Sequence, residues 1–286
     1  MKQSGFVTGT LVHTDKGLVP IEQLKVGDLV LSKHESGDGE VAYKRVLKTF
    51  KSPEKQKIIR IAYVQPRNMD PHFIKTIIYE NNGDYNVLSS EVMEPRISGE
   101  LYIFCTENHL FWTKESGWVA AKDIAESGFY DSIQYAFENM YGIPLFVYDS
   151  SSYRTPLNKT PIDGVAAVVN QNLNSECRNE VDALIDFRSG RPLTLVGVPA
   201  IDEFPGVDTF HANNIDASQE LVNFENFNDH PILNELLALD VFKFGDTIDE
   251  SRYFLDTVYN IKLEEFHTYY VGYAGVWVHD SQPLPT

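Results

Sequence analysis

The chain has 286 residues, of which 43% are hydrophobic and 23% charged, a composition typical of a globular protein large enough to hold a domain with an insertion. A formal net charge of −17 disfavours a general nucleic-acid-binding surface. No apolar run reaches the roughly 20 residues of a membrane-spanning helix, and no N-terminal stretch has the layout of a signal peptide. Two cysteines, Cys105 and Cys177, are too few for a disulfide framework or a zinc cluster. We therefore expect a chain that folds in the cytoplasm and binds no cofactor, metal, membrane or nucleic acid.

Residues 1–129 contain a series of short strand patterns separated by turn residues. Thr10–Thr14 and Leu18–Ile21 flank the turn Asp15-Lys16-Gly17, in which glycine is free to take a positive φ, and this pattern predicts a hairpin. Glu22–Asp28 is expected to form one helical turn or a loop. Further strands rich in Val, Ile and aromatic residues are predicted at Asp28–Ser32, Lys44–Phe50, Lys57–Val64, Phe73–Tyr79, Leu101–Thr106, His109–Thr113 and Gly117–Ala121.

Cys105 lies within the apolar run Leu101–Cys105. A lone cysteine in such a run is expected to be a small buried hydrophobic side chain and not a reactive thiol.

The composition changes in residues 130–250. This segment holds 20 Asp and Glu against 6 Lys and Arg, so it carries −14 of the net charge of −17. Apolar spacing in Glu180–Phe187 and Pro231–Phe242 predicts helices, whereas Leu193–Val198 has the pattern of a strand. The segment is therefore predicted to be an acidic insertion of mixed α/β structure.

Strand patterns return in residues 251–286, at Phe254–Leu263, Thr268–Gly272 and Gly275–Val278. Many short strands favour the all-β class. We predict one β domain formed by residues 1–129 and 251–286, which the insertion at 130–250 interrupts.

Three separated blocks carry the functional information. The first is Gly5–Val12, which continues to Ile21–Leu31; the second is Thr106–His109, followed by Phe111-Trp112 and Gly117–Val119; the third comprises Val258–Ile261, His267–Gly272 and Gly275–Ser281. In this order they resemble the Hint family, which includes inteins, bacterial intein-like domains and the pretoxin-processing domains of polymorphic bacterial toxins. The Tyr-Val-Gly and Gly-Val-Trp-Val-His motifs of the third block are most similar to the last two groups. The resemblance covers about residues 4–124 and 253–281.

The resemblance implies a horseshoe-shaped, all-β Hint fold with adjacent termini, and a self-catalysed cleavage or splicing reaction on the flanking segments of the domain's own precursor. At the upstream junction, the first residue attacks the preceding carbonyl and forms an ester or thioester. Thr106 would bind and twist that peptide, and His109 would donate a proton to its departing nitrogen.

At the downstream junction, the resemblance implies that a terminal Asn side chain attacks its own carbonyl. His279 would polarise that carbonyl and His267 would relay protons. Ser281, the next residue, could accept the upstream chain and turn cleavage into splicing.

The sequence departs from the family pattern at three positions. Gly5 stands where the family has Cys or Ser, so it offers no nucleophile. Asp280 replaces the terminal Asn, and a carboxylate cyclises less readily at neutral pH than an amide. Asn260 replaces a common Asp. Two routes stay open: both ends are disabled and the chain is a trapped precursor, or Ser281 attacks the Ser4–Gly5 carbonyl directly.

We therefore expect an autoprocessing, single-turnover domain that is weak or inactive in this form, in the cytoplasm or within the precursor of a secreted bacterial toxin. The alternative is a non-catalytic spacer or binding module whose acidic insertion docks a basic protein partner. Gly5 and Asp280 favour the alternative, whereas Thr106, His109, His267 and His279 favour the processing domain.

Overall fold

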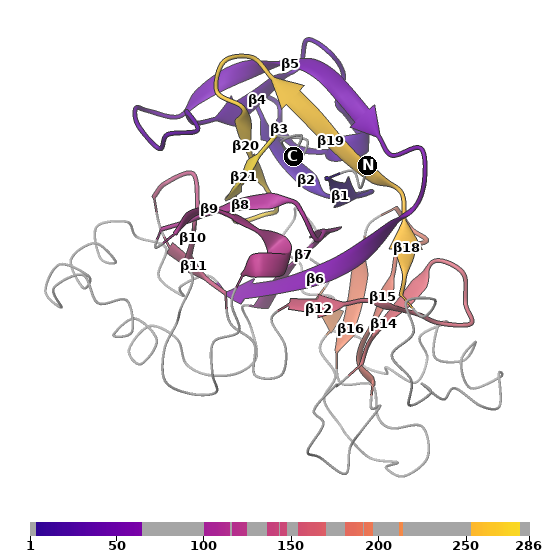
Figure 1. Ribbon diagram of the computed structural model, residues 1–286. Coiled ribbons are helices and arrows are strands. Elements are labelled where there is room, and N and C mark those ends of the chain that lie inside the picture. Colours follow the sequence, from indigo (N-terminus) through magenta and orange to yellow (C-terminus); the bar gives the residue numbers. More distant parts are fainter. Residues whose placement is uncertain are drawn as a thin grey trace, which may run out of the picture. The chain divides into compact units, whose positions relative to one another are not determined.

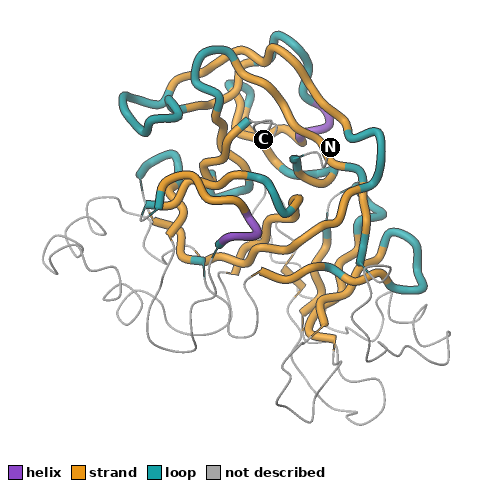
Figure 2. The backbone as a smooth tube through the Cα atoms, viewed as in Figure 1, coloured by secondary structure: helices purple, strands orange, loops and turns teal. Residues whose placement is uncertain are grey.

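The computed structural model describes residues 4–64, 100–114, 116–124, 136–142, 144–147, 154–169, 181–190, 192–196, 212–213 and 253–280. Strands dominate these residues, and their helical elements are two single 3₁₀ turns, η1 (Ile21–Gln23) and η2 (Ala121–Asp123) (Figure 2). The prediction of the all-β class is confirmed. The chain forms two compact units, one of Met1–Arg154 with Thr257–Thr286 and one of Thr155–Asp256.

The first unit is built on one antiparallel sheet (Figure 1). Its strands pair in the order β10-β11-β6-β7-β1-β19-β5-β4-β2-β20-β21-β8-β9, and β3 pairs with β2. An additional pairing of β10 with β8 closes this path on itself, which leaves few unpaired edges. The strands are β1 (Phe6–Val7), β2 (Leu11–Thr14), β3 (Gly17–Pro20), β4 (Leu29–Ser32), β5 (Ala42–Lys51), β6 (Gln56–Val64), β7 (Glu100–Thr106), β8 (Leu110–Thr113), β9 (Gly117–Ala120), β10 (Ala136–Glu138), β11 (Pro144–Phe146), β19 (Val258–Leu263), β20 (Thr268–Val271) and β21 (Val276–His279).

The β2–β3 hairpin forms where the turn residues predict it. Thr14 pairs with Gly17, and Gly17 takes a φ of 95°, a conformation that glycine adopts without steric cost. Alternate residues of β2 and β4 are buried, as the period of a strand with one covered face requires. The core beneath the sheet includes Phe6, Val12, Val30, Ile61, Phe111 and Val278.

Strand β1 joins the first described residues to two strands that lie far away in the sequence. It pairs with β7 through Phe6 and Cys105 on one side, and with β19 through Phe6 and Tyr259 on the other. In Figure 1, β1 and β19 accordingly lie side by side. The residues just before β1 therefore meet residues that are more than 250 positions away along the chain.

The second unit, which covers most of the predicted insertion, is described as strands. Its sheet has the order β13-β14-β15-β16-β17, with bounds β13 (Asn158–Lys159), β14 (Val165–Val169), β15 (Val181–Asp186), β16 (Leu193–Val196) and β17 (Ala212–Asn213). Two short strands, β12 (Arg154–Pro156) and β18 (Leu255–Asp256), lie at the boundaries between the units. The predicted strand at Leu193–Val198 is present as β16.

The prediction of a helix at Glu180–Phe187 is wrong, because Val181–Asp186 within this segment form strand β15. A short apolar run fits either structure by spacing alone. Here β14 and β16 flank it, with Leu184 opposite both Ala167 and Leu195, and pairing on both sides satisfies its backbone. The predicted helix Pro231–Phe242 and the predicted strand Phe73–Tyr79 lie outside the described residues.

The unit boundaries also differ from the predicted ones. Strands β10 and β11, predicted to belong to the insertion at 130–250, pair with β8 and β6 and belong to the first unit. The change in charge near residue 130 therefore precedes the change of unit at residue 155.

Candidate active site

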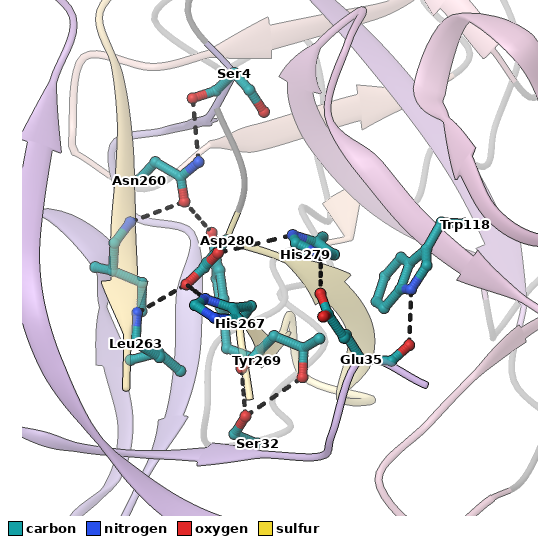
Figure 3. Close-up of polar contacts among 12 residues, drawn as sticks. Ser4, Ser32, Glu35, Trp118, Asn260, Leu263, His267, Tyr269, His279 and Asp280 are labelled. Carbon is teal, nitrogen blue, oxygen red and sulfur yellow. Dashed lines mark hydrogen bonds and ion pairs between the residues drawn. The ribbon is translucent and has the colours of Figure 1, made fainter. Parts of the chain in front are cut away.

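The Ser4–Gly5 peptide is held at both of its polar atoms. The Gly5 N–H donates a hydrogen bond to Thr106 Oγ1 at 3.1 Å. Asn260 Nδ2 donates to the Ser4 carbonyl oxygen at 3.3 Å, as Figure 3 shows. A backbone bond from Thr106 N–H to the Gly5 carbonyl, 3.0 Å, fixes the register of this segment on β7. The arrangement orients one particular peptide bond and polarises its carbonyl.

Asn260 is fully engaged in this contact. Its Oδ1 accepts from the backbone N–H of Ile261 at 2.8 Å and from the Tyr269 hydroxyl at 2.7 Å, which orients Nδ2 toward Ser4. An ionised Asp at this position would have only acceptors and could not donate to the Ser4 carbonyl. Asn260 can therefore make a contact that an ionised Asp could not make.

His109 lies on the other side of the same peptide and is completely buried. Its Nδ1 is 2.7 Å from Ser4 Oγ, and its ring packs on Phe6 with centroids 4.1 Å apart. Burial, and secondarily the positive charge that His279 can carry, lower the pKa of His109 from 6.5 to about 3. His109 is therefore neutral at physiological pH, and its Nε2 has no hydrogen-bond partner among the described residues.

Asp280 forms the second half of the site and is also buried. Its Oδ2 accepts from the Leu263 backbone N–H at 2.8 Å, and it lies 3.5 Å from His267 Nδ1, while Oδ1 lies 3.7 Å from His279 Nδ1 (Figure 3). Burial raises the pKa of Asp280, and the Leu263 N–H bond and the two histidines partly offset this effect. A backbone bond from the Asp280 N–H to the His267 carbonyl, 2.8 Å, holds the residue in place.

His267 and Tyr269 show two further features of the site. His267 has a φ of 58°, a conformation that is uncommon for a residue with a side chain. Tyr269, whose pKa is raised by burial and by the charge of Asp280, reaches Asn260 and so connects the surroundings of Asp280 with the Ser4 carbonyl.

The space at Gly5 is closed. A Cβ atom built on this residue would lie 2.6 Å from the Tyr259 carbonyl oxygen and 3.2 Å from the Val258 Cβ. A contact below 3 Å with backbone requires β19 to shift. Glycine at position 5 therefore also allows the backbone of β19 to pack close to its Cα.

The structure brings together seven of the eight predicted site residues. Thr106, His109 and Asn260 surround Gly5 or the carbonyl before it, and His267, His279 and Asp280 surround the downstream end. Ser281 lies outside the described residues. Their chemical roles stay predictions.

Three residues of the site were not predicted. The sequence analysis assigns no role to the Ser4 hydroxyl, yet it contacts His109. Tyr269 lies in the third block without an assigned role, yet its hydroxyl contacts Asn260. Glu35 contacts His279 Nε2 at 3.0 Å. No local signal marks Glu35, since it lies in a polar loop 244 positions from its partner.

Cys105 is buried in β7 and burial raises the pKa of its thiol well above the ordinary range, as expected of a core cysteine. Cys177 lies outside the described residues. Within the described ranges, no helix has the length and apolarity to cross a membrane, and no three His, Cys, Asp or Glu side chains gather as a metal site would need.

The sequence matches no protein-family model and no curated protein. Its structure is similar to those of inteins. A bacterial intein-like domain from Clostridium thermocellum is 18% identical, with a TM-score of 0.41 over 98% of this chain and 99% of that chain. A DnaB intein from Synechocystis sp. PCC 6803 is 9% identical, with a TM-score of 0.35 over 98% and 99%. The gp41-1 intein is 19% identical, with a TM-score of 0.31 over 58% of this chain and 93% of that chain.

Proposed function

We propose that this chain is a self-processing domain of the Hint type, which acts on the segments that flank it in its own precursor and is weak or inactive in its present form. One observation carries the proposal: the Ser4–Gly5 peptide and Asp280, 275 residues apart, are held by neighbouring side chains that include Thr106, His109 and His279. A reaction that joins or severs both ends of a domain needs both junctions at one set of acid–base groups.

The downstream half of the site is suited to cyclisation of residue 280 except for the atom that attacks. Loss of the following segment requires a side-chain amide nitrogen to attack the residue's own carbonyl carbon, which forms a succinimide and releases the amine of Ser281. Asp280 offers a carboxylate, whose oxygens the Leu263 N–H and the histidines already engage. On this proposal the two histidines would assist the reaction, and Asp280 lacks the amide that would attack.

The upstream half has a polarised peptide without a nucleophile at residue 5. Gly5→Cys, which would supply one, is expected to displace β19 because of the contact with the Tyr259 carbonyl. Restoration of the upstream step therefore needs a backbone shift as well as a thiol. The alternative in which Ser281 attacks the Ser4 carbonyl stays a prediction.

The test is the single change Asp280→Asn, which restores the amide and keeps an acceptor for the Leu263 N–H. We expect the parent chain to stay at 32.5 kDa through long incubation at pH 7. The Asp280→Asn variant should lose Ser281–Thr286, as measured by intact-mass spectrometry over time. Addition of His279→Ala should slow this release by about 100-fold or more, the usual contribution of a general acid–base group.

Asp38→Asn is the matched control, because it makes the same chemical change on an exposed loop residue. It should not lose Ser281–Thr286. If the Asp280→Asn variant is folded and remains intact over days, self-processing at the downstream junction is excluded.

A second candidate is a processing fold retained as a spacer or binding module. The close contact of Gly5 with the backbone of β19 favours it, since a site that still used residue 5 would leave room for a side chain. On this second candidate, the acidic insertion docks a basic partner. On the first candidate, the flanking cargo is a toxin precursor. An uncut Asp280→Asn variant would make the second candidate the better one.

A further inference from the structure

The imidazole of His279 contacts Glu35, which lies outside the three sequence blocks, and Trp118, which has no assigned role in the second block. Its Nε2 lies 3.0 Å from Glu35 Oε2, and the Trp118 indole packs against the ring edge to face, with centroids 4.9 Å apart and planes at 82° (Figure 3). On the opposite side, Nδ1 faces Asp280 Oδ1 at 3.7 Å. The two ring nitrogens therefore point to two different carboxylates.

The loop that carries Glu35 is itself anchored. It follows β4, where the Ser32 hydroxyl donates to the Thr268 carbonyl at 2.6 Å and the Lys33 N–H donates to Thr268 Oγ1 at 3.3 Å. The Glu35 carbonyl accepts from Trp118 Nε1 at 2.9 Å. Strands β20 and β9 thus hold the backbone on both sides of the Glu35 side chain, although the side chain itself is 46% exposed.

We propose that Glu35 is a positioning residue for His279, which fixes the proton of the neutral imidazole on Nε2 and leaves Nδ1 as a proton acceptor directed at residue 280. A carboxylate can only accept a hydrogen bond, so the 3.0 Å contact requires a proton on Nε2. In a neutral ring the other nitrogen then carries a lone pair.

The inference rests on the proposed function and gives it a direction of proton transfer. When a side-chain amide at position 280 attacks its own carbonyl carbon, Nδ1 of His279 takes the proton that the attacking nitrogen loses. The imidazolium so formed is stabilised by the Glu35 carboxylate, and its proton can then pass to the departing nitrogen of Ser281. His279 ends the reaction neutral, with the same tautomer as before.

The first measurement needs no cleavage. Ring ¹⁵N chemical shifts of His279 in the full chain near pH 7.5 report which nitrogen carries the proton. We expect Nε2–H in the parent and in Asp38→Ala, a matched loss of an exposed carboxylate from the same loop. Glu35→Ala should give a mixture of tautomers.

The second measurement is the rate of release of Ser281–Thr286 in the Asp280→Asn background. We expect Glu35→Ala to slow release about 10-fold, the lower range for a residue that orients a functional histidine. Asp38→Ala should have no effect. In a variant that already carries His279→Ala, Glu35→Ala should slow release little further. The reason is that Glu35 acts only through the Nδ1 proton acceptor of His279.

An unchanged tautomer in Glu35→Ala would overturn the proposal, whatever the rates are. An equal rate in the Asp280→Asn background with and without Glu35→Ala would overturn it as well. If Asp280→Asn is not cleaved at all, the proposed function fails, while the ¹⁵N measurement still decides whether Glu35 sets the tautomer of His279.

Discussion

At the scale of single residues, the burial of His109 has a consequence for acid stability. The imidazole is completely enclosed, and its pKa is lowered from 6.5 to about 3, mainly by burial. A histidine that is harder to protonate in the folded state than in the unfolded state stabilises the fold fully above pH 6.5. This contribution is lost progressively as the pH falls from 6.5 toward 3, because the unfolded chain takes up a proton that the folded chain excludes.

We therefore predict that His109→Leu reduces the acid sensitivity of the protein. Between pH 7 and pH 4, the fall in the free energy of unfolding should be smaller than in the parent by roughly 3 kcal/mol. Urea unfolding at several pH values measures this slope. The control is His34→Leu, since His34 is exposed and its loss should leave the slope as it is. Parallel curves for parent and His109→Leu would show that His109 is protonated normally in the folded state.

At the scale of elements, a two-residue strand positions half of the candidate site. Strand β1 lies between β7 and β19, and the Phe6 side chain is fully buried against His109 and, edge to face, against Phe111 and Tyr269. Two residues of backbone pairing contribute little by themselves. The aromatic packing of Phe6 therefore adds to the hydrogen bonds that keep the Ser4–Gly5 peptide next to Thr106 and Asn260.

We predict that Phe6→Ala lowers the free energy of unfolding by about 3–5 kcal/mol, as expected for loss of a buried aromatic ring. It should also expose the Gly5 amide to faster hydrogen exchange, because the register of β1 is loosened. Tyr43→Ala in β5, where the side chain is 50% exposed, should cost less than about 0.5 kcal/mol. Equal, small losses for both variants would mean that β1 is not an anchored element.

At the scale of the whole molecule, the two ends of the second unit lie next to each other. The Phe254 N–H donates to the Leu157 carbonyl at 2.7 Å, and Asn158 pairs with Tyr253, so the two ends of the second unit lie side by side. The core of the first unit is formed by its own residues. An inserted unit with adjacent ends can be removed at little cost in chain entropy.

We predict that replacement of residues 157–254 by a short Gly-Ser linker leaves the first unit folded. The ¹H–¹⁵N spectrum should retain the dispersed amide signals of β1, β19 and β21, including those of Gly5 and Asp280. A collapse of these signals would show that the second unit is needed for the fold of the first. Retention of the signals with loss of release in the Asp280→Asn background would instead assign the second unit a part in processing.

The amino-acid sequence by itself determined where many strands of the first unit lie, among them the β2–β3 hairpin. These properties follow from consecutive residues: alternating burial in β2 and β4, the positive φ of Gly17, and the spacing of Thr106 and His109 around one turn. The tertiary structure alone decided that Val181–Asp186 form a strand, that Tyr259 closes the space at Gly5, and that Glu35 binds His279. Each of these depends on a partner that the chain brings near only by folding, and a local pattern of side chains carries no information about such a partner.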